Sequence, residues 1–193
     1  KQLREHMQYE IKHIHERLGV TVVYVTHDQG EALTMSDRVA VFNDGRIQQI
    51  DAPRTIYEHP DTAFVAQFIG ENNRIEGKVA MISEGLAEVV LADGARVVAE
   101  AGPGLETGAD ALVSLRPERI AVGEAAGSAR NRHEGTISEV IYHGDHLRLR
   151  IAALGRDDFV VKAPVVGAEH LRPGATVPLG WRPNDGRALP LDG

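Results

Sequence analysis

The chain has 193 residues, of which 42% are hydrophobic and 25% charged, and its 21 basic and 28 acidic residues give a formal net charge of −7. This length suits one large domain or two small ones, and the acidic balance argues against nucleic acid as a partner, because that affinity comes from clustered Lys and Arg. The sequence contains no cysteine, which excludes disulfides, thiolate catalysis and cysteine-ligated zinc.

Glycine and proline divide the chain into two parts of different character. Residues 1–70 contain 4 Gly and 2 Pro, whereas residues 71–193 contain 16 Gly and 7 Pro. The first part is therefore expected to form long regular elements, and the second to form short strands joined by turns. We place the boundary between Gly70 and Asn73. No internal repeat and no low-complexity segment is apparent.

The first part begins with a predicted helix and a predicted strand. Apolar residues recur at helical spacing, and Gly19 follows them as a helix stop; the stripe consists of Leu3, Met7, Ile11, Ile14 and Leu18. The β-branched run of residues 20–26 predicts a strand that is buried on both faces, as in a parallel α/β sheet. No apolar run approaches the ~20 residues that span a bilayer.

The rest of the first part is predicted to contain short elements. A short helix passes through residues 31–33, and a hairpin turns at Asn43-Asp44-Gly45. Two further helices are predicted, one over residues 53–58 with Pro53 in its first turn and one over residues 61–68 with Asp61 as its cap. Together with the buried strand, these elements predict an α/β arrangement.

The second part is predicted to be all-β. Turn residues separate eight candidate strands, at residues 75–82, 86–91, 96–99, 111–115, 135–142, 146–151, 159–162 and 176–181. Eight short strands at this spacing predict a small barrel or sandwich, with Trp181, the only tryptophan, in its core.

His27 is the strongest candidate for a residue with a chemical role. It follows the predicted buried strand and precedes a helix, at the edge of an α/β sheet where ligands bind. An imidazole there can donate a hydrogen bond to a phosphate oxygen or orient an attacking water. A lone histidine at a strand end is also a common structural residue, so position alone leaves both interpretations open.

Three segments resemble one protein family. Residues 20–50 resemble the stretch that follows the nucleotide-hydrolysing motif in the ATPase subunits of ABC transporters. Residues 51–70 extend the resemblance, particularly to importers of the maltose, spermidine/putrescine and ferric-ion type. Leu115-Arg116-Pro117-Glu118 resembles the LRPE signature of the C-terminal, TOBE-type regulatory domain of these subunits, which is an OB-like barrel. The resemblance covers essentially the whole chain.

The resemblance implies a role for each part. Residues 1–70 would be the C-terminal part of the nucleotide-binding domain, an α/β remnant, and residues 71–193 an OB-like regulatory and dimerisation domain. His27 occupies the position of the switch histidine, which contacts the γ-phosphate. The intact protein would be a homodimer that uses ATP and Mg²⁺, works with transmembrane permease subunits and a substrate-binding protein, and lies on the cytoplasmic face of the cell membrane. The wording of residues 68–73 slightly favours polyamine import.

The motifs that bind nucleotide are missing from these residues. A phosphate-binding loop needs G-x-x-x-x-G-K-[ST], but the one Gly-Lys pair, Gly77-Lys78, is followed by Val. No signature motif is present, and no strand ends in the Asp-Glu pair that holds magnesium. Since these motifs precede the matching region in the family, we expect a piece of a longer chain that by itself is inactive and binds neither ATP nor a metal.

Several alternatives remain open. The chain could instead be a non-enzymatic module that senses a small anion or only dimerises, with residues 116–119 receiving the anion or forming an ion pair through Glu118. His143 and His146 flank a turn and could form a weak metal site or serve the turn alone. The three histidines of the first helix either bind a metal or form a solvated face; they are His6, His13 and His15.

Overall fold

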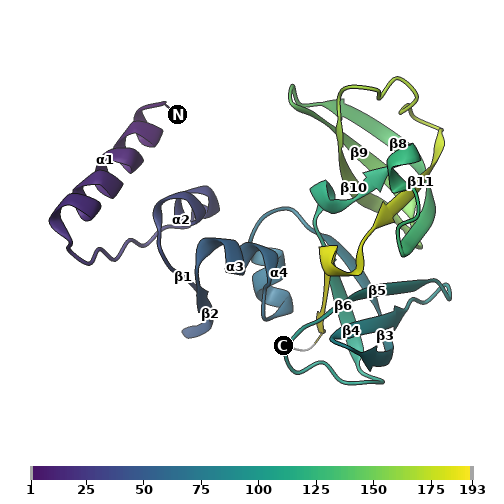
Figure 1. Cartoon of the computed structure of the whole chain (residues 1–193), viewed down its shortest axis with the longest axis horizontal. Coiled ribbons are helices and arrows are strands. Elements are labelled where there is room, and N and C mark those ends of the chain that lie inside the picture. The colour runs from purple at the N-terminus through teal and green to yellow at the C-terminus, as the bar shows by residue number, and fades with distance from the viewer. Residues whose placement is uncertain (1, 192–193) are drawn as a thin grey trace. The chain divides into compact units, whose positions relative to one another are not determined.

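The computed structural model describes residues 2–191, with side chains from His6 onward (Figure 1). The chain forms two compact units, residues 1–60 and 61–193. Among the described residues, no helix combines the length and the apolar character that a membrane span requires.

The first unit opens with helix α1 (Gln2–Leu18), as predicted, and Gly19 follows it with a φ of +63°. This left-handed conformation ends helices and favours glycine. The apolar stripe of α1 is solvent-exposed at Met7, Ile14 and Leu18, and the side chain of Leu3 lies outside the described residues. The helix thus presents an apolar face that the described part of this unit does not cover.

The prediction of a buried strand over residues 20–26 is wrong for this structure. The segment has no regular secondary structure, and Val23 and Val25 are 87% and 90% exposed. A strand exists only when a neighbouring strand pairs with its backbone, and no described strand pairs with this segment. The one sheet that the described residues of this unit form is the antiparallel pair β1–β2, so no parallel sheet is present among them.

The remaining elements of the first unit follow the sequence prediction. Helix α2 (Gln29–Met35) precedes strands β1 (Val39–Asn43) and β2 (Arg46–Asp51), and helix α3 (Pro53–Glu58) follows with Pro at its start. Asp44 and Gly45 have φ angles of 47° and 73°, which confirms a hairpin turn that needs two left-handed residues.

The boundary of the compact units lies earlier than the predicted one because helix α4 (Ala63–Phe68) packs on the second unit. Val65 and Ala66 of α4 are fully buried. The predicted cap, Asp61, is also incorrect: the hydroxyl of Thr62 accepts a hydrogen bond of 3.2 Å from the Val65 amide and caps the helix. Helix α4 therefore belongs structurally with the strands that follow it.

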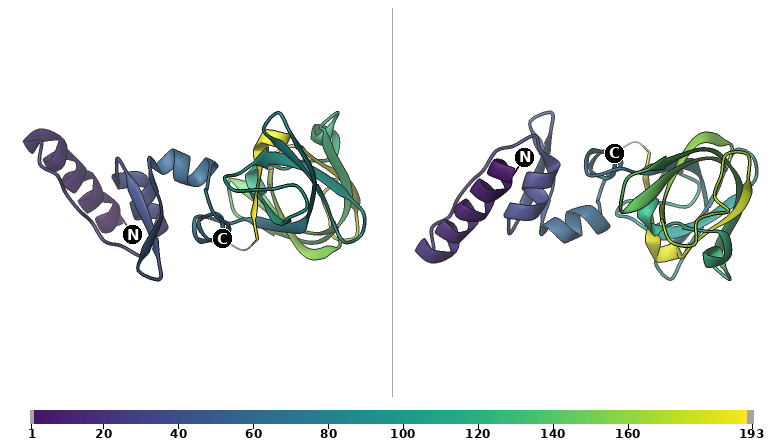
Figure 2. Two further views of the ribbon diagram at one scale, coloured as in Figure 1. Left: turned by 90° about the horizontal axis from the view of Figure 1, so that it is seen from below. Right: turned by 90° about the horizontal axis from the view of Figure 1, so that it is seen from above.

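The second unit is an OB-like β structure, and the predicted small barrel is confirmed (Figure 1). Five strands close a barrel in the order β12-β5-β4-β3-β6, and five form a sheet in the order β10-β9-β8-β11-β7. In both views of Figure 2 the strands of this unit curl into a ring. The strands are β3 (Asn73–Ser83), β4 (Leu86–Val90), β5 (Arg96–Ala101), β6 (Asp110–Leu115), β7 (Ala121–Val122), β8 (Asn131–Tyr142), β9 (His146–Ala153), β10 (Arg156–Pro164), β11 (Thr176–Trp181) and β12 (Gly186–Pro190).

All eight predicted strands are present, and β7 and β12 are additional. The described part of the unit also contains three short 3-10 helices: η1 (Pro117–Arg119), η2 (Gly123–Ala126) and η3 (Pro183–Asp185). Strand β7 has two residues, and β12 begins with Gly and ends with Pro, so neither shows the pattern that identifies a strand from sequence.

The second unit consists of two copies of one strand pattern, which overturns the expectation of no internal repeat. Residues 73–77 (NRIEG) open β3, and residues 131–135 (NRHEG) open β8. Asn73 lies opposite Leu115 on β6, and Asn131 lies opposite Trp181 on β11, in the same antiparallel register. Each opposite residue is followed by Arg-Pro and a 3-10 helix. The copies therefore match residue by residue at these positions.

The two copies exchange their last strands. Strand β7 follows the first copy in sequence but pairs with β11 of the second, whereas β12 follows the second copy and pairs with β6 and β5 of the first. In Figure 1 the yellow C-terminal strand runs from the β8–β11 group to the β3–β6 group. Because of this exchange, neither copy completes its sheet without the other.

Two buried asparagines strengthen the contact between the copies. The Asn131 side chain accepts a hydrogen bond from the Val98 amide at 2.7 Å and donates one to the Val98 carbonyl at 2.8 Å. Asn73 makes the equivalent pair with Val160, at 2.7 Å for both bonds. Each copy thus inserts the amide of its first strand into the third strand of the other, β5 or β10. We call this contact the seam.

Candidate functional site

The loop that carries His27 is fixed by its neighbours. The Thr26 hydroxyl accepts a hydrogen bond from the Asp28 amide at 2.9 Å and donates one to the Glu31 carboxylate at 2.7 Å, and Tyr24 donates to the same carboxylate at 3.1 Å. Asp28 caps α2 by accepting hydrogen bonds from the amides of Gly30 and Glu31. These contacts shape a tight turn, while the His27 side chain is exposed to solvent.

This arrangement separates the structural residues of the loop from His27. Glu31 is 9% exposed and, with Thr26 and Asp28, defines the backbone path. An exposed imidazole on a fixed backbone can approach a phosphate or a water molecule supplied by another surface. The tether from Tyr24 and Thr26 to Glu31 was not found from the sequence, because it depends on where those side chains point.

The segment Leu115-Arg116-Pro117-Glu118 forms a structural joint in the second unit. Leu115 is fully buried and Arg116 is 5% exposed. The Arg116 guanidinium donates hydrogen bonds to the Ile69 carbonyl and, at 3.2 Å, to the Glu71 carbonyl. The buried Pro117 then starts η1, and Glu118 is exposed. Arg116 therefore binds backbone carbonyls that follow α4, which does not favour it as a receptor for a free anion.

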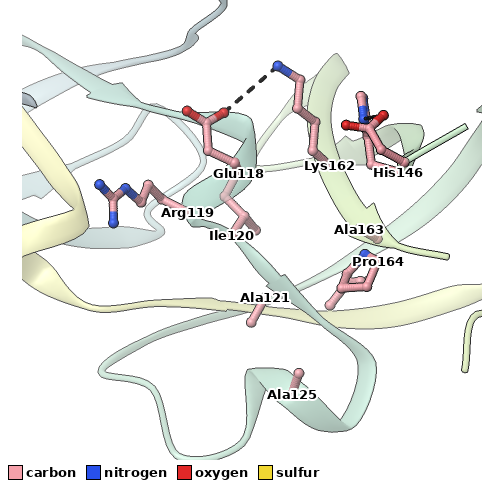
Figure 3. Close-up of a pocket in the computed structure, with 11 residues that line it drawn as sticks. Glu118, Arg119, Ile120, Ala121, Ala125, His146, Lys162, Ala163 and Pro164 are labelled. Carbon is pink, nitrogen blue, oxygen red and sulfur yellow. Dashed lines mark hydrogen bonds and ion pairs between the residues drawn. The ribbon is translucent and has the colours of Figure 1, made fainter. Parts of the chain in front are cut away.

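A groove of about 740 Å³ lies beside this joint (Figure 3). Its lining includes Glu118, Arg119 and Lys162, with alanine and proline side chains between them. Lys162 Nζ lies 3.9 Å from a Glu118 oxygen and 3.4 Å from a Glu71 oxygen. Two carboxylates already compensate this cation, so the groove offers little net charge to a small anion.

The carboxylate of Glu71 links Lys162, which lines this groove, to Arg148 on strand β9. Partial burial tends to raise the pKa of Glu71, but Arg148, at 2.7 Å, and Lys162 outweigh burial, so the pKa lies below its ordinary value. Glu71 is therefore a carboxylate bridging β9 and β10. This bridge could not be predicted from the sequence, because its residues are far apart along the chain.

The histidine pairs do not form metal sites in the described part of the chain. No group of three potential ligands lies close enough there to hold a metal. The His143 and His146 rings stack at 5.1 Å with planes 9° apart, and a metal must lie in the plane of each imidazole that binds it, which near-parallel planes do not allow. On α1, His15 contacts the Val20 carbonyl at 2.7 Å and Asp37 at 3.3 Å.

Replacing Arg116 with Ala is expected to destabilise the second unit by about 3 kcal/mol, because it leaves buried carbonyls without their charged donor. Chemical denaturation of the wild type and the variant measures this difference. Arg132→Ala, a change at an exposed position, is the control and is expected to cost under about 0.5 kcal/mol. Equal stability of Arg116→Ala and wild type would contradict the role of Arg116 as a joint.

Comparison with known proteins gives consistent matches. The family model of the TOBE domain matches residues 113–189. The chain is 42% identical over 190 residues to the spermidine/putrescine import ATP-binding protein PotA of Acidothermus cellulolyticus, covering 97% of this chain and 50% of that protein. It is 40% identical over 183 residues to the uncharacterized ABC transporter ATP-binding protein YdcT of Escherichia coli, covering 93% of this chain and 47% of that protein.

The chain thus spans about half the length of the curated relatives it matches. Among solved structures, the cytoplasmic molybdate-binding protein ModG in a molybdate-bound crystal form is similar, with a TM-score of 0.57 and 16% identity, covering 63% of this chain and 99% of that one. At this identity the similarity concerns the fold alone, and it agrees with the OB-like architecture of the second unit.

Proposed function

We propose that this chain is the C-terminal part of an ABC-transporter ATP-binding subunit with a TOBE domain, and that the intact subunit couples ATP hydrolysis to polyamine import. The observation that carries the proposal is the continuous match, over 97% of the chain, to relatives named as spermidine/putrescine import proteins. The match includes both the loop of His27 and the strands of the second unit.

His27 is the proposed catalytic residue. In the intact dimer its imidazole donates a hydrogen bond to the γ-phosphate and helps to position the attacking water. The exposure of His27 on a backbone held by Thr26 and Asp28 supports this role. ATP with Mg²⁺ supplies the phosphoryl group when bound. The residues that hold it lie in motifs that these 193 residues do not contain, so the chain alone is inactive.

The two parts of the chain have different proposed roles. Residues 1–70 complete the nucleotide-binding domain, and residues 71–193 regulate and dimerise the subunit. The partners are a second copy, transmembrane permease subunits and a substrate-binding protein, so the protein works at the cytoplasmic face of the cell membrane. A purely non-enzymatic anion sensor is less well supported, because Glu71 and Glu118 already compensate Lys162 in the groove.

Transport measurements test the substrate. Deleting the gene for the intact subunit is expected to abolish ATP-dependent uptake of radiolabelled spermidine and putrescine, and a plasmid copy is expected to restore it. Uptake of maltose and ferric iron in the same strain serves as the control and should not change. Loss of maltose or iron uptake, with polyamine uptake intact, would overturn the polyamine assignment.

A further inference from the structure

The two copies in the second unit differ at two equivalent core positions. In the first copy these positions hold Ile75 and Leu115, which are 1% and 0% exposed. The same register places His133 and Trp181 there in the second copy. The His133 and Trp181 rings stack with centroids 5.3 Å apart and planes 30° apart. The same fold therefore contains an aliphatic pair in one copy and a titratable aromatic pair in the other.

The aromatic pair leaves two polar atoms without partners. His133 Nε2 and Trp181 Nε1 are both buried and make no hydrogen bond. A buried polar atom without a partner destabilises a fold, whereas an aliphatic side chain of suitable size does not. The aliphatic side chains of Ile75 and Leu115 fill the equivalent positions in the first copy. The fold itself therefore does not require a histidine at position 133.

Within the described part of the chain, a single charged side chain influences the pKa of His133. Asp93, in the turn between β4 and β5, is the charged group that acts on the imidazole. On β8 itself the adjacent Arg132 and Glu134 are exposed and alternate to the opposite face, and the β11 residues opposite, Leu179 and Trp181, are uncharged. Burial lowers the pKa of His133 below its ordinary value, and the attraction of Asp93 opposes this only in part.

His133 also lies next to the seam. Strand residues alternate between faces, so His133 shares a face with Asn131, whose side chain binds the Val98 backbone. An imidazolium at this half-buried position would lose part of its hydration and would have no hydrogen-bond partner on Trp181. Moving toward water and Asp93 would relieve both penalties but would break the stack.

We propose that His133 is a pH-sensitive switch at the seam between the two copies: the neutral ring stacks on Trp181 and holds β8 in place, and the protonated ring leaves the stack and weakens the Asn131–Val98 contact. The switch links mild acidification to loosening of the second unit, independently of nucleotide chemistry.

The single tryptophan makes the test direct. Trp181 is the only tryptophan in the chain, so tryptophan fluorescence reports on the surroundings of this one ring, which contacts His133 and Phe159. We expect the fluorescence of the purified chain to change sigmoidally between about pH 8 and about pH 4.5, with a midpoint below the ordinary histidine value of about 6.5. His133→Ile, which restores the residue of the first copy, is expected to remove this transition. His146→Gln, at the stacked pair of the β8–β9 turn, is the control and should retain it.

A second readout concerns stability and exchange. The folded state keeps His133 neutral while the unfolded chain binds the proton, so the wild type should lose stability relative to His133→Ile as the pH falls below about 6.5 and match its pH dependence above it. Hydrogen exchange at the Val98 amide, corrected for intrinsic rates, should accelerate over the same interval in the wild type only. His133→Gln, which is polar but does not titrate, replaces His133→Ile if that variant misfolds. Superimposable curves for wild type and the non-titrating variant would overturn the proposal.

Discussion

His27→Ala in the intact subunit is expected to lower kcat for ATP hydrolysis by about 10²- to 10³-fold, the usual cost of removing one hydrogen-bond donor that stabilises a transition state. The structure makes the substitution selective. Thr26, Asp28 and Glu31 form the hydrogen bonds that shape the loop, whereas the imidazole is exposed. Alanine therefore removes the proposed γ-phosphate contact and leaves the turn intact. Steady-state phosphate release, measured with the intact subunit, gives the effect.

The control is a histidine that is also exposed but lies on helix α1. His13→Ala should leave kcat within about twofold of the wild type, a change too small to indicate loss of a transition-state contact. The 193-residue chain should show neither saturable Mg-ATP binding nor turnover. Retention of wild-type kcat by His27→Ala would refute the catalytic role. Turnover by the chain alone would show that it contains a nucleotide site outside the known motifs.

The elements that sequence predicted correctly are those that local interactions determine. The turn at Asn43-Asp44-Gly45 has left-handed φ angles at Asp44 and Gly45, which Asp and Gly readily adopt. Helix α3 begins at Pro53 because proline suits the first helical turn. The strand prediction for residues 20–26 was wrong, because a strand needs a partner strand from elsewhere in the chain. The apolar composition of this segment indicates burial, but the described chain supplies no strand to pair with it.

The internal repeat escaped detection for a related reason. The two copies share residues only at positions where the fold imposes the same steric or hydrogen-bonding requirement on both. Gly77 and Gly135 are equivalent, and a Cβ on either would lie 2.5 Å from a neighbouring atom, Val90 O or Ile151 Cγ2. Core positions such as Ile75 and His133 differ, because packing accepts several side chains of suitable volume. Register and strand exchange, which identify the repeat, become visible only in three dimensions.

A similar distinction applies to the candidate site. His27 is proposed from its place after an apolar run and from family resemblance, both of which are properties of the sequence. The role of Arg116 was not predicted, because its partners, the carbonyls of Ile69 and Glu71, carry no side-chain signal. A motif can thus mark an important position while its composition suggests the wrong interaction for one residue, here an anion at Arg116 in place of a backbone clamp. The ion pair predicted through Glu118 does form, with Lys162 at 3.9 Å.

Asn131→Ala is expected to lower the free energy of unfolding of the second unit by about 3 kcal/mol, since it leaves both the amide and the carbonyl of Val98 without their partner, at about 1–3 kcal/mol for each buried group. Asn131 is 2% exposed, so water does not replace the lost bonds without rearrangement of the seam. Urea denaturation, monitored by Trp181 fluorescence and by circular dichroism, measures the loss.

Asn73→Ala is the matched variant, because Asn73 makes the same two bonds to Val160. We expect a loss of similar size, and Arg132→Ala again provides the exposed control. If the exchanged strands β7 and β12 make the copies one cooperative structure, each variant should shift a single transition seen identically by both probes. Two separate transitions would mean that each copy folds independently, and losses below about 1 kcal/mol would mean that the strand exchange, rather than the asparagines, holds the seam.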